Sequence, residues 1–82
     1  MADTPQLFGK PGKRHSFGWR WKSGPWDVYY EPGDGQHYIE IQHVDCLVFD
    51  RWYRQRAAAL RATERKLASL VGSLIAMGAP HG

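Results

Sequence analysis

A chain of 82 residues with a formal net charge of +3 allows one domain, and its single cysteine excludes an internal disulfide. The sequence begins without the basic and then apolar order of a secretory signal, and its longest largely apolar run, residues 67–79, is shorter than the roughly 20 residues that span a bilayer. We therefore expect a cytoplasmic protein that does not associate with a membrane.

Charged side chains are sorted along the chain into three blocks. Residues 1–22 are basic, residues 23–50 carry six carboxylates and neither lysine nor arginine, and residues 51–82 are basic again. Ten of the eleven aromatic residues lie between Phe17 and Tyr53. This distribution indicates an aromatic, turn-rich sheet region joined to a basic helix.

The first segment is rich in proline and glycine and has few apolar side chains. We interpret residues 1–14 as a flexible basic arm and residues 15–82 as a single α+β domain. The arm carries Lys10, Lys13 and Arg14, which are candidate contacts for an acidic partner.

Apolar and polar residues alternate with the period of two that is typical of strands in residues 16–22, 26–31 and 38–43. Residues 23–25 and 32–35 between them contain the glycines and prolines of turns. The pattern predicts a three-stranded antiparallel meander.

For the first hairpin we expect Trp19 to pair with Val28 and Arg20 to lie opposite Asp27, a favourable cross-strand pair. A slip of two residues would leave the same side chains on each face.

From about Cys46 the apolar period becomes helical and predicts one long C-terminal helix over residues 46–77, with Asp45 or Asp50 as its N-cap. Such a helix would be about 48 Å long, whereas six- or seven-residue strands reach about 20–23 Å. The sheet cannot cover its apolar end, so we expect a homodimer through this helix. The alternative is a helix that breaks near Gly72 and folds back. The expected dimer interface comprises Leu67, Leu70, Val71, Leu74 and Ile75.

Arginine clusters on the face of the predicted helix that is opposite its apolar face. The planar guanidinium binds phosphate or carboxylate through two bonds, and aromatic rings left exposed on the sheet could add stacking contacts. The candidate residues for partner or nucleic-acid binding are Arg51, Arg54, Arg61, Arg65, Lys10, Lys13, Arg14, Trp52 and Tyr29.

The metal-type side chains with a suggestive spacing are His37, His43 and Cys46. A structural zinc site needs four ligands, and the sequence places no fourth beside them. Cys46 with His43 as a nucleophile pair would need a third group to orient the histidine, which the sequence also lacks. We expect no metal, no cofactor and no enzymatic activity.

These observations favour a small non-enzymatic protein-binding module. It would act as an adaptor or inhibitor by occupying a surface of a larger partner, as small inhibitors encoded by phages and mobile elements often do. The alternative is a nucleic-acid-binding accessory protein that uses the basic helix face and the N-terminal arm.

Overall fold

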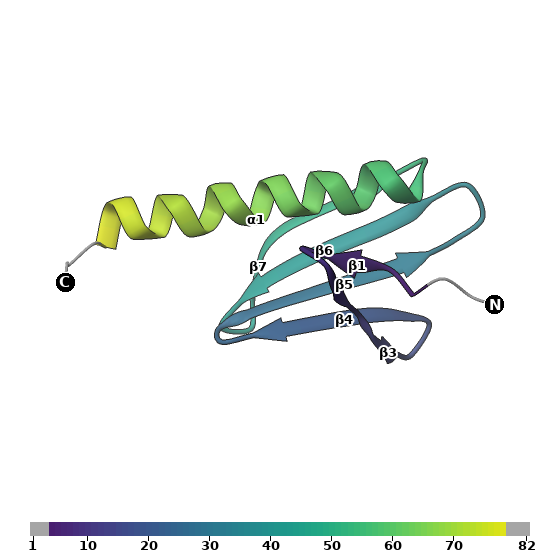
Figure 1. The fold of residues 1–82 in the computed structure, drawn as a ribbon, viewed down its shortest axis with the longest axis horizontal. Helices are drawn as coiled ribbons and strands as arrows, with labels where there is room; N and C mark the ends of the chain where they lie inside the picture. Colours follow the sequence, from purple (N-terminus) through teal and green to yellow (C-terminus); the bar gives the residue numbers. More distant parts are fainter. Residues whose placement is uncertain (1–3, 79–82) are drawn as a thin grey trace.

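The computed structural model describes residues 4–78, and the side chains of residues 4–72. Two antiparallel sheets have the strand orders β1-β2 and β3-β4-β5-β6-β7, and one helix follows them (Figure 1). The predicted α+β class is confirmed. The prediction of a three-stranded meander is wrong in its number of strands, because the larger sheet has five strands and the prediction covers only the three in the middle, β4, β5 and β6. The elements are β1 (Gln6–Leu7), β2 (Lys10–Pro11), β3 (Lys13–His15), β4 (Gly18–Ser23), β5 (Trp26–Pro32), β6 (His37–His43), β7 (Cys46–Tyr53) and α1 (Arg56–Gly78).

Strand β7 occupies the segment that was predicted to begin the helix. A two-residue turn, Val44-Asp45, joins β6 to β7 and pairs His43 with Cys46. Both turn residues have positive φ, 50° and 63°, as in the tight turns whose twist matches a hairpin. The helix therefore begins at Arg56 and is about 34 Å long at 1.5 Å per residue.

The backbone of Val44 is strained, because a β-branched side chain rarely adopts positive φ. Its side chain is 63% exposed, so its replacement forfeits little packing. We expect Val44→Asn to raise the free energy of unfolding by about 1 kcal/mol, since asparagine tolerates this conformation. Urea denaturation measures the change, and an equal or lower stability would contradict the assigned turn.

The hairpin between β4 and β5 has the predicted faces but not the predicted register. Trp21 rather than Trp19 lies opposite Val28, which is a shift of two residues. Arg20 and Asp27 still form an ion pair, now along the diagonal of the two strands, with 2.6 Å between Nη2 and Oδ2.

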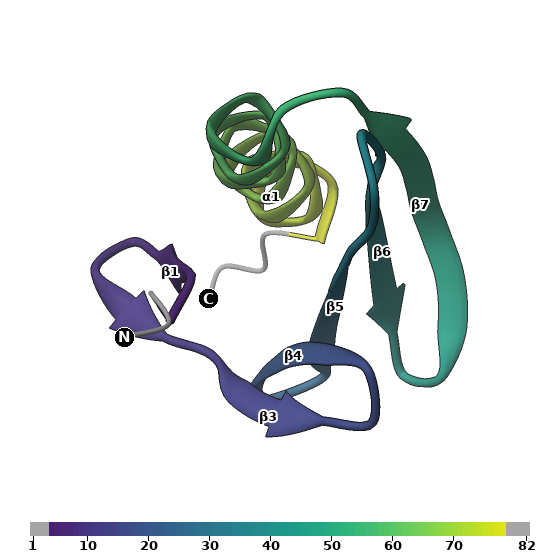
Figure 2. The ribbon, with the colours of Figure 1, turned by 90° about the vertical axis from the view of Figure 1, so that its right-hand side faces the viewer.

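Residues 4–14 of the predicted arm lie against the domain. The β1–β2 hairpin packs beside α1, where the Phe8 amide donates to Glu64 Oε2 at 2.7 Å (Figure 2). The indole Nε1–H of Trp21 donates to the carbonyl of Lys10 at 2.8 Å. Leu7 is buried in the core, and so this hairpin closes one side of it.

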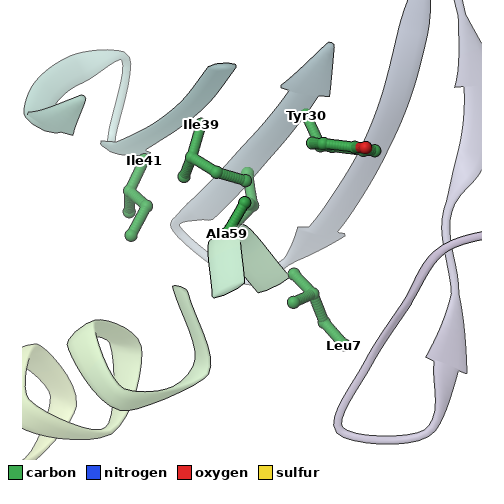
Figure 3. Packing of buried hydrophobic residues seen from close by; sticks show 6 residues of the cluster. Leu7, Tyr30, Ile39, Ile41 and Ala59 are labelled. Carbon is green, nitrogen blue, oxygen red and sulfur yellow. The ribbon is translucent and has the colours of Figure 1, made fainter. Parts of the chain in front are cut away.

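The core lies between α1 and the concave side of the sheet, which curves around the helix (Figure 2). Side chains of β5 and β6 meet Ala59 of the helix and Leu7 of the hairpin there (Figure 3). Beside Ala59, the buried Thr63 hydroxyl donates to the Ala59 carbonyl at 2.7 Å, which satisfies it without a partner from the sheet. The buried apolar side chains of the five-stranded sheet are Val28, Tyr30, Ile39 and Ile41.

Candidate functional site

The helix covers one face of the five-stranded sheet and leaves the other open (Figure 2). Since successive side chains of a strand point to opposite faces, the residues between Val28 and Tyr30, or between Ile39 and Ile41, point away from the core. We call this side the outer face. One open face is common for an antiparallel sheet, but it is usually polar.

Charge changes sign across the outer face. One row of cross-strand neighbours runs from β3 to β7 through Lys13, Arg20, Tyr29, Glu40 and Asp50. A second row runs from β5 to β7 through Glu31, Tyr38 and Trp52. The cations therefore stand on β3 and β4 and the carboxylates on β5, β6 and β7. We call the group formed by Glu31, Tyr38, Glu40, Asp50 and Trp52 the acidic-aromatic patch.

Arg20 and Asp27 mark the boundary between the two charges. Arg20 Nε donates to Asp27 Oδ1 at 2.9 Å, and the hydrogen bonds from this guanidinium hold the pKa of the carboxyl below its ordinary value. Around the pair lies an open polar pocket of about 290 Å³, lined by His15, Ser16, Arg20, Asp27, Tyr29, Glu40 and Gln42.

Each tyrosine of the outer face donates to a carboxylate on its own strand. The Tyr29 hydroxyl donates to Glu31 Oε1 at 2.6 Å, and the Tyr38 hydroxyl donates to Glu40 Oε1 at 2.8 Å. Burial and then this hydrogen bond raise the pKa of Tyr29 to about 12, and the same two causes raise the pKa of Tyr38. Both hydroxyls therefore stay neutral donors at physiological pH.

Glu40 and Asp50 face each other directly across β6 and β7. Like charges in this position are destabilising. Both groups that donate to Glu40 are neutral. The amide Nε2 of Gln42 donates to Oε2 at 2.7 Å, and the Tyr38 hydroxyl donates to Oε1. The hydrogen bonds orient the carboxylate of Glu40 without neutralising it.

Trp52 is the most open ring of the patch, with 59% of its surface exposed. Its ring centroid lies 4.9 Å from that of Tyr38, with 45° between the planes. A large ring in water beside carboxylates has no evident structural role within the described chain, and such rings are typical of binding surfaces.

Both aromatic candidates from the sequence, Tyr29 and Trp52, lie on the outer face. Of the cationic candidates, Lys13 lies in an outer-face row, at the β3 edge. The guanidinium carbon of Arg14 lies 5.1 Å over the Trp19 ring on β4, and that of Arg51 lies 5.7 Å over the Phe49 ring on β7.

The remaining cations are exposed on separate elements. Strands β3 and β7 are opposite edges of the sheet, so Lys13 and Arg51 stand on strands that have three others between them. Lys10 lies on β2, Lys13 on β3, Arg54 between β7 and α1, and Arg61 and Arg65 on α1.

Sequence analysis did not name Glu31, Tyr38, Glu40 and Asp50 as candidate binding residues, and it considered Asp50 only as a helix N-cap. The signal was present, since the alternation in residues 38–43 already places Tyr38 and Glu40 on one face. Asp50 could not be placed on this face from the sequence, because its segment, strand β7, was predicted as helix.

The expected dimer interface is only partly described. Leu67 and Leu70 are partly buried against the core, whereas Val71 is 37% exposed. The side chains of Leu74 and Ile75 lie outside the described residues.

The histidines of the sequence pattern stand at opposite ends of β6. His37 Nδ1 lies 2.7 Å from the Tyr30 hydroxyl, and the His43 ring packs 4.6 Å from that of Trp26. Over residues 4–78, His, Cys, Asp and Glu side chains form no group that could hold a metal ion.

Across residues 4–78, no helix is long and apolar enough to cross a membrane.

The chain matches no known family, no curated protein and no solved structure.

Proposed function

We propose that this protein is a non-enzymatic protein-binding module, an adaptor or inhibitor that presents the outer face of its sheet to a larger partner. The observation that carries the proposal is Trp52, a mostly exposed ring that stands with Tyr38 among carboxylates on an otherwise uncovered face. Tryptophan, tyrosine and arginine are the side chains that dominate the binding energy of protein interfaces.

A small-molecule site is a weaker interpretation of the same face. The pocket around Arg20 and Asp27 is about 290 Å³, at the lower limit of ligand cavities, which are also mostly apolar. Its lining is polar, and Arg20 and Asp27 already satisfy each other. An open, convex face fits a macromolecular partner better.

Nucleic acid is also a weaker candidate. Glu31, Glu40 and Asp50 would repel phosphates from the aromatic rings that could stack on bases. On the outer face, Lys13 and Arg20 stand on β3 and β4, whereas Trp52 stands on β7 at the opposite edge of the sheet.

The test is affinity capture from the native host with the wild-type domain, Trp52→Ser and Phe17→Ser. Phe17 is the matched control, since it is 77% exposed but lies in the β3–β4 turn rather than in the patch. A captured protein is then purified and titrated by calorimetry. We expect Trp52→Ser to weaken binding about 30-fold or more, as for a hot-spot residue, and Phe17→Ser to leave it unchanged. Equal binding by both variants would overturn the proposal.

A homodimer through α1 stays part of the proposal. Its support is that the C-terminal turns of the helix run beyond the end of the sheet (Figure 1). Sedimentation velocity at micromolar concentration should show a dimer, and monomer alone would contradict it.

A further inference from the structure

We propose that the acidic-aromatic patch receives an arginine side chain of the partner, whose guanidinium lies against the Tyr38–Trp52 rings and bonds to the carboxylates beside them. This inference rests on the proposed function, because it specifies the chemistry of the segment that the outer face binds. Three properties of the patch support it: its charge, its rings and its position at the sheet edge.

The charge of the patch calls for a cation from outside the chain. Glu40 and Asp50 are directly opposed, and Glu31 stands one strand away beside Tyr38. The nearest cation along the row, Arg20, lines the same pocket as Glu40, but Tyr29 stands between them in the row and the guanidinium bonds to Asp27. A guanidinium between Glu40 and Asp50 would convert their repulsion into two attractions.

The donor arrangement leaves Asp50 available to such a ligand. Tyr38 and Gln42 each donate to one oxygen of Glu40, so its carboxylate is held in place before binding. Asp50 is exposed, and its contact with the Tyr38 hydroxyl is long, 3.5 Å. Its oxygens can therefore accept both hydrogen bonds of a guanidinium fork.

The rings distinguish arginine from lysine. A planar guanidinium can stack on an aromatic face while its edge bonds to a carboxylate, whereas an ammonium group is a point charge that is more strongly hydrated. The Tyr38 and Trp52 rings are 4.9 Å apart, and the row that they form borders the row of Glu40 and Asp50. Both contacts are thus within reach of one side chain.

The position of the patch at the edge of the sheet makes it accessible to a partner. Within the described chain, β7 has a neighbour on one side only, and it carries both Asp50 and Trp52. A partner segment can approach the patch from this edge without displacing any element that the structure describes.

The test titrates the isotopically labelled domain with three capped peptides at physiological salt. Each has seven residues in which threonine alternates with arginine, with lysine, or with citrulline, the neutral isostere of arginine. Amide and indole shifts are followed by NMR. We expect saturable shifts centred on Tyr38, Glu40, Asp50 and Trp52 with the arginine peptide. We expect binding about threefold or more weaker with lysine and none with citrulline.

Charge variants locate the site. Glu40→Gln and Asp50→Asn should each weaken the arginine peptide about tenfold, the usual effect of removing one partner of a charged hydrogen bond. Asp45→Asn is the matched control, because it removes the same charge from an exposed residue in the β6–β7 turn, and asparagine tolerates its positive φ. Its affinity should stay at the wild-type value. Equal affinity for lysine and arginine, or equal loss in all three variants, would overturn the assignment in favour of general electrostatic attraction.

Failure of this inference is distinguishable from failure of the proposed function. If the peptide shifts lie elsewhere while Trp52→Ser still abolishes capture of a partner, the arginine assignment is wrong and the protein-binding face stands. If Trp52→Ser leaves capture unchanged, the proposed function itself fails.

Discussion

Gly18→Ala should lower the free energy of unfolding by about 3 kcal/mol, the upper end of the usual cost of overpacking. An added Cβ would stand 2.2 Å from the Tyr30 carbonyl oxygen and 2.9 Å from two atoms of the Tyr29 ring. The ring can rotate away, but the carbonyl belongs to the paired strand β5 and can move only with the backbone. The same change would displace Tyr29 on the outer face.

Gly72→Ala is the matched control for this experiment. An added Cβ on Gly72 meets nothing within 4 Å, and alanine favours a helix over glycine by up to about 1 kcal/mol. Urea denaturation of both variants measures the contrast. If Gly18→Ala stays within about 0.5 kcal/mol of wild type, a typical value for surface substitutions, the close approach of β4 and β5 at this position is wrong.

Ile39→Ala should cost about 3–4 kcal/mol, the range for large-to-small substitutions in a core that cannot collapse. Ile39 is fully buried, lies opposite Tyr30, and packs beneath the helix near Ala59 (Figure 3). For a domain of this size, that loss corresponds to a fall in Tm of about 15–20 °C.

Thermal unfolding followed by circular dichroism measures this shift. Val71→Ala serves as the control, because Val71 is 37% exposed on the helix, and it should change the Tm by only a few degrees, about 3 °C or less. A small shift for Ile39→Ala would mean that the helix does not seal the sheet at this point.

The central strands could be predicted from the sequence because their apolar and polar residues alternate regularly. The predicted strands at residues 16–22, 26–31 and 38–43 coincide largely with β4, β5 and β6. The exception among their apolar residues is Phe17, which lies in the β3–β4 turn and is 77% exposed. The register of β4 with β5 could not be predicted, since a shift of two residues leaves the same side chains on each face.

Strand β7 could not be predicted because its turn carries no recognisable signal. Val44-Asp45 adopts positive φ without glycine or asparagine, and Asp45 resembles a helix cap instead. Phe49, Trp52 and Tyr53 also fit a helical period when they are followed by the Ala57–Ala59 run. Tertiary pairing with β6 decides the conformation.

The N-terminal hairpin was hidden for a different reason. Its strands of two residues are too short to show a period, and Leu7 is buried only because α1 lies beside it. The hydrogen bond from the Phe8 amide to Glu64 joins positions 56 residues apart, which no local pattern reveals.

The candidate site, too, could be predicted only in part from the sequence. The acidic block and the aromatic clustering are visible in the sequence, and both contribute to the patch. The opposition of Glu40 to Asp50 and the contact of Tyr38 with Trp52 depend on the pairing of β6 with β7. Sequence reasoning therefore emphasised the basic residues, which the fold distributes over separate elements.

The central claim is that the outer face of the sheet binds another protein. It is tested most directly by mapping amide shifts of the labelled domain on addition of the purified partner. We predict the largest changes along β6 and β7, at Tyr38, Glu40, Asp50 and Trp52, with little change along α1. Changes concentrated on the exposed side of α1, with Tyr38 and Trp52 unaffected, would contradict the claim.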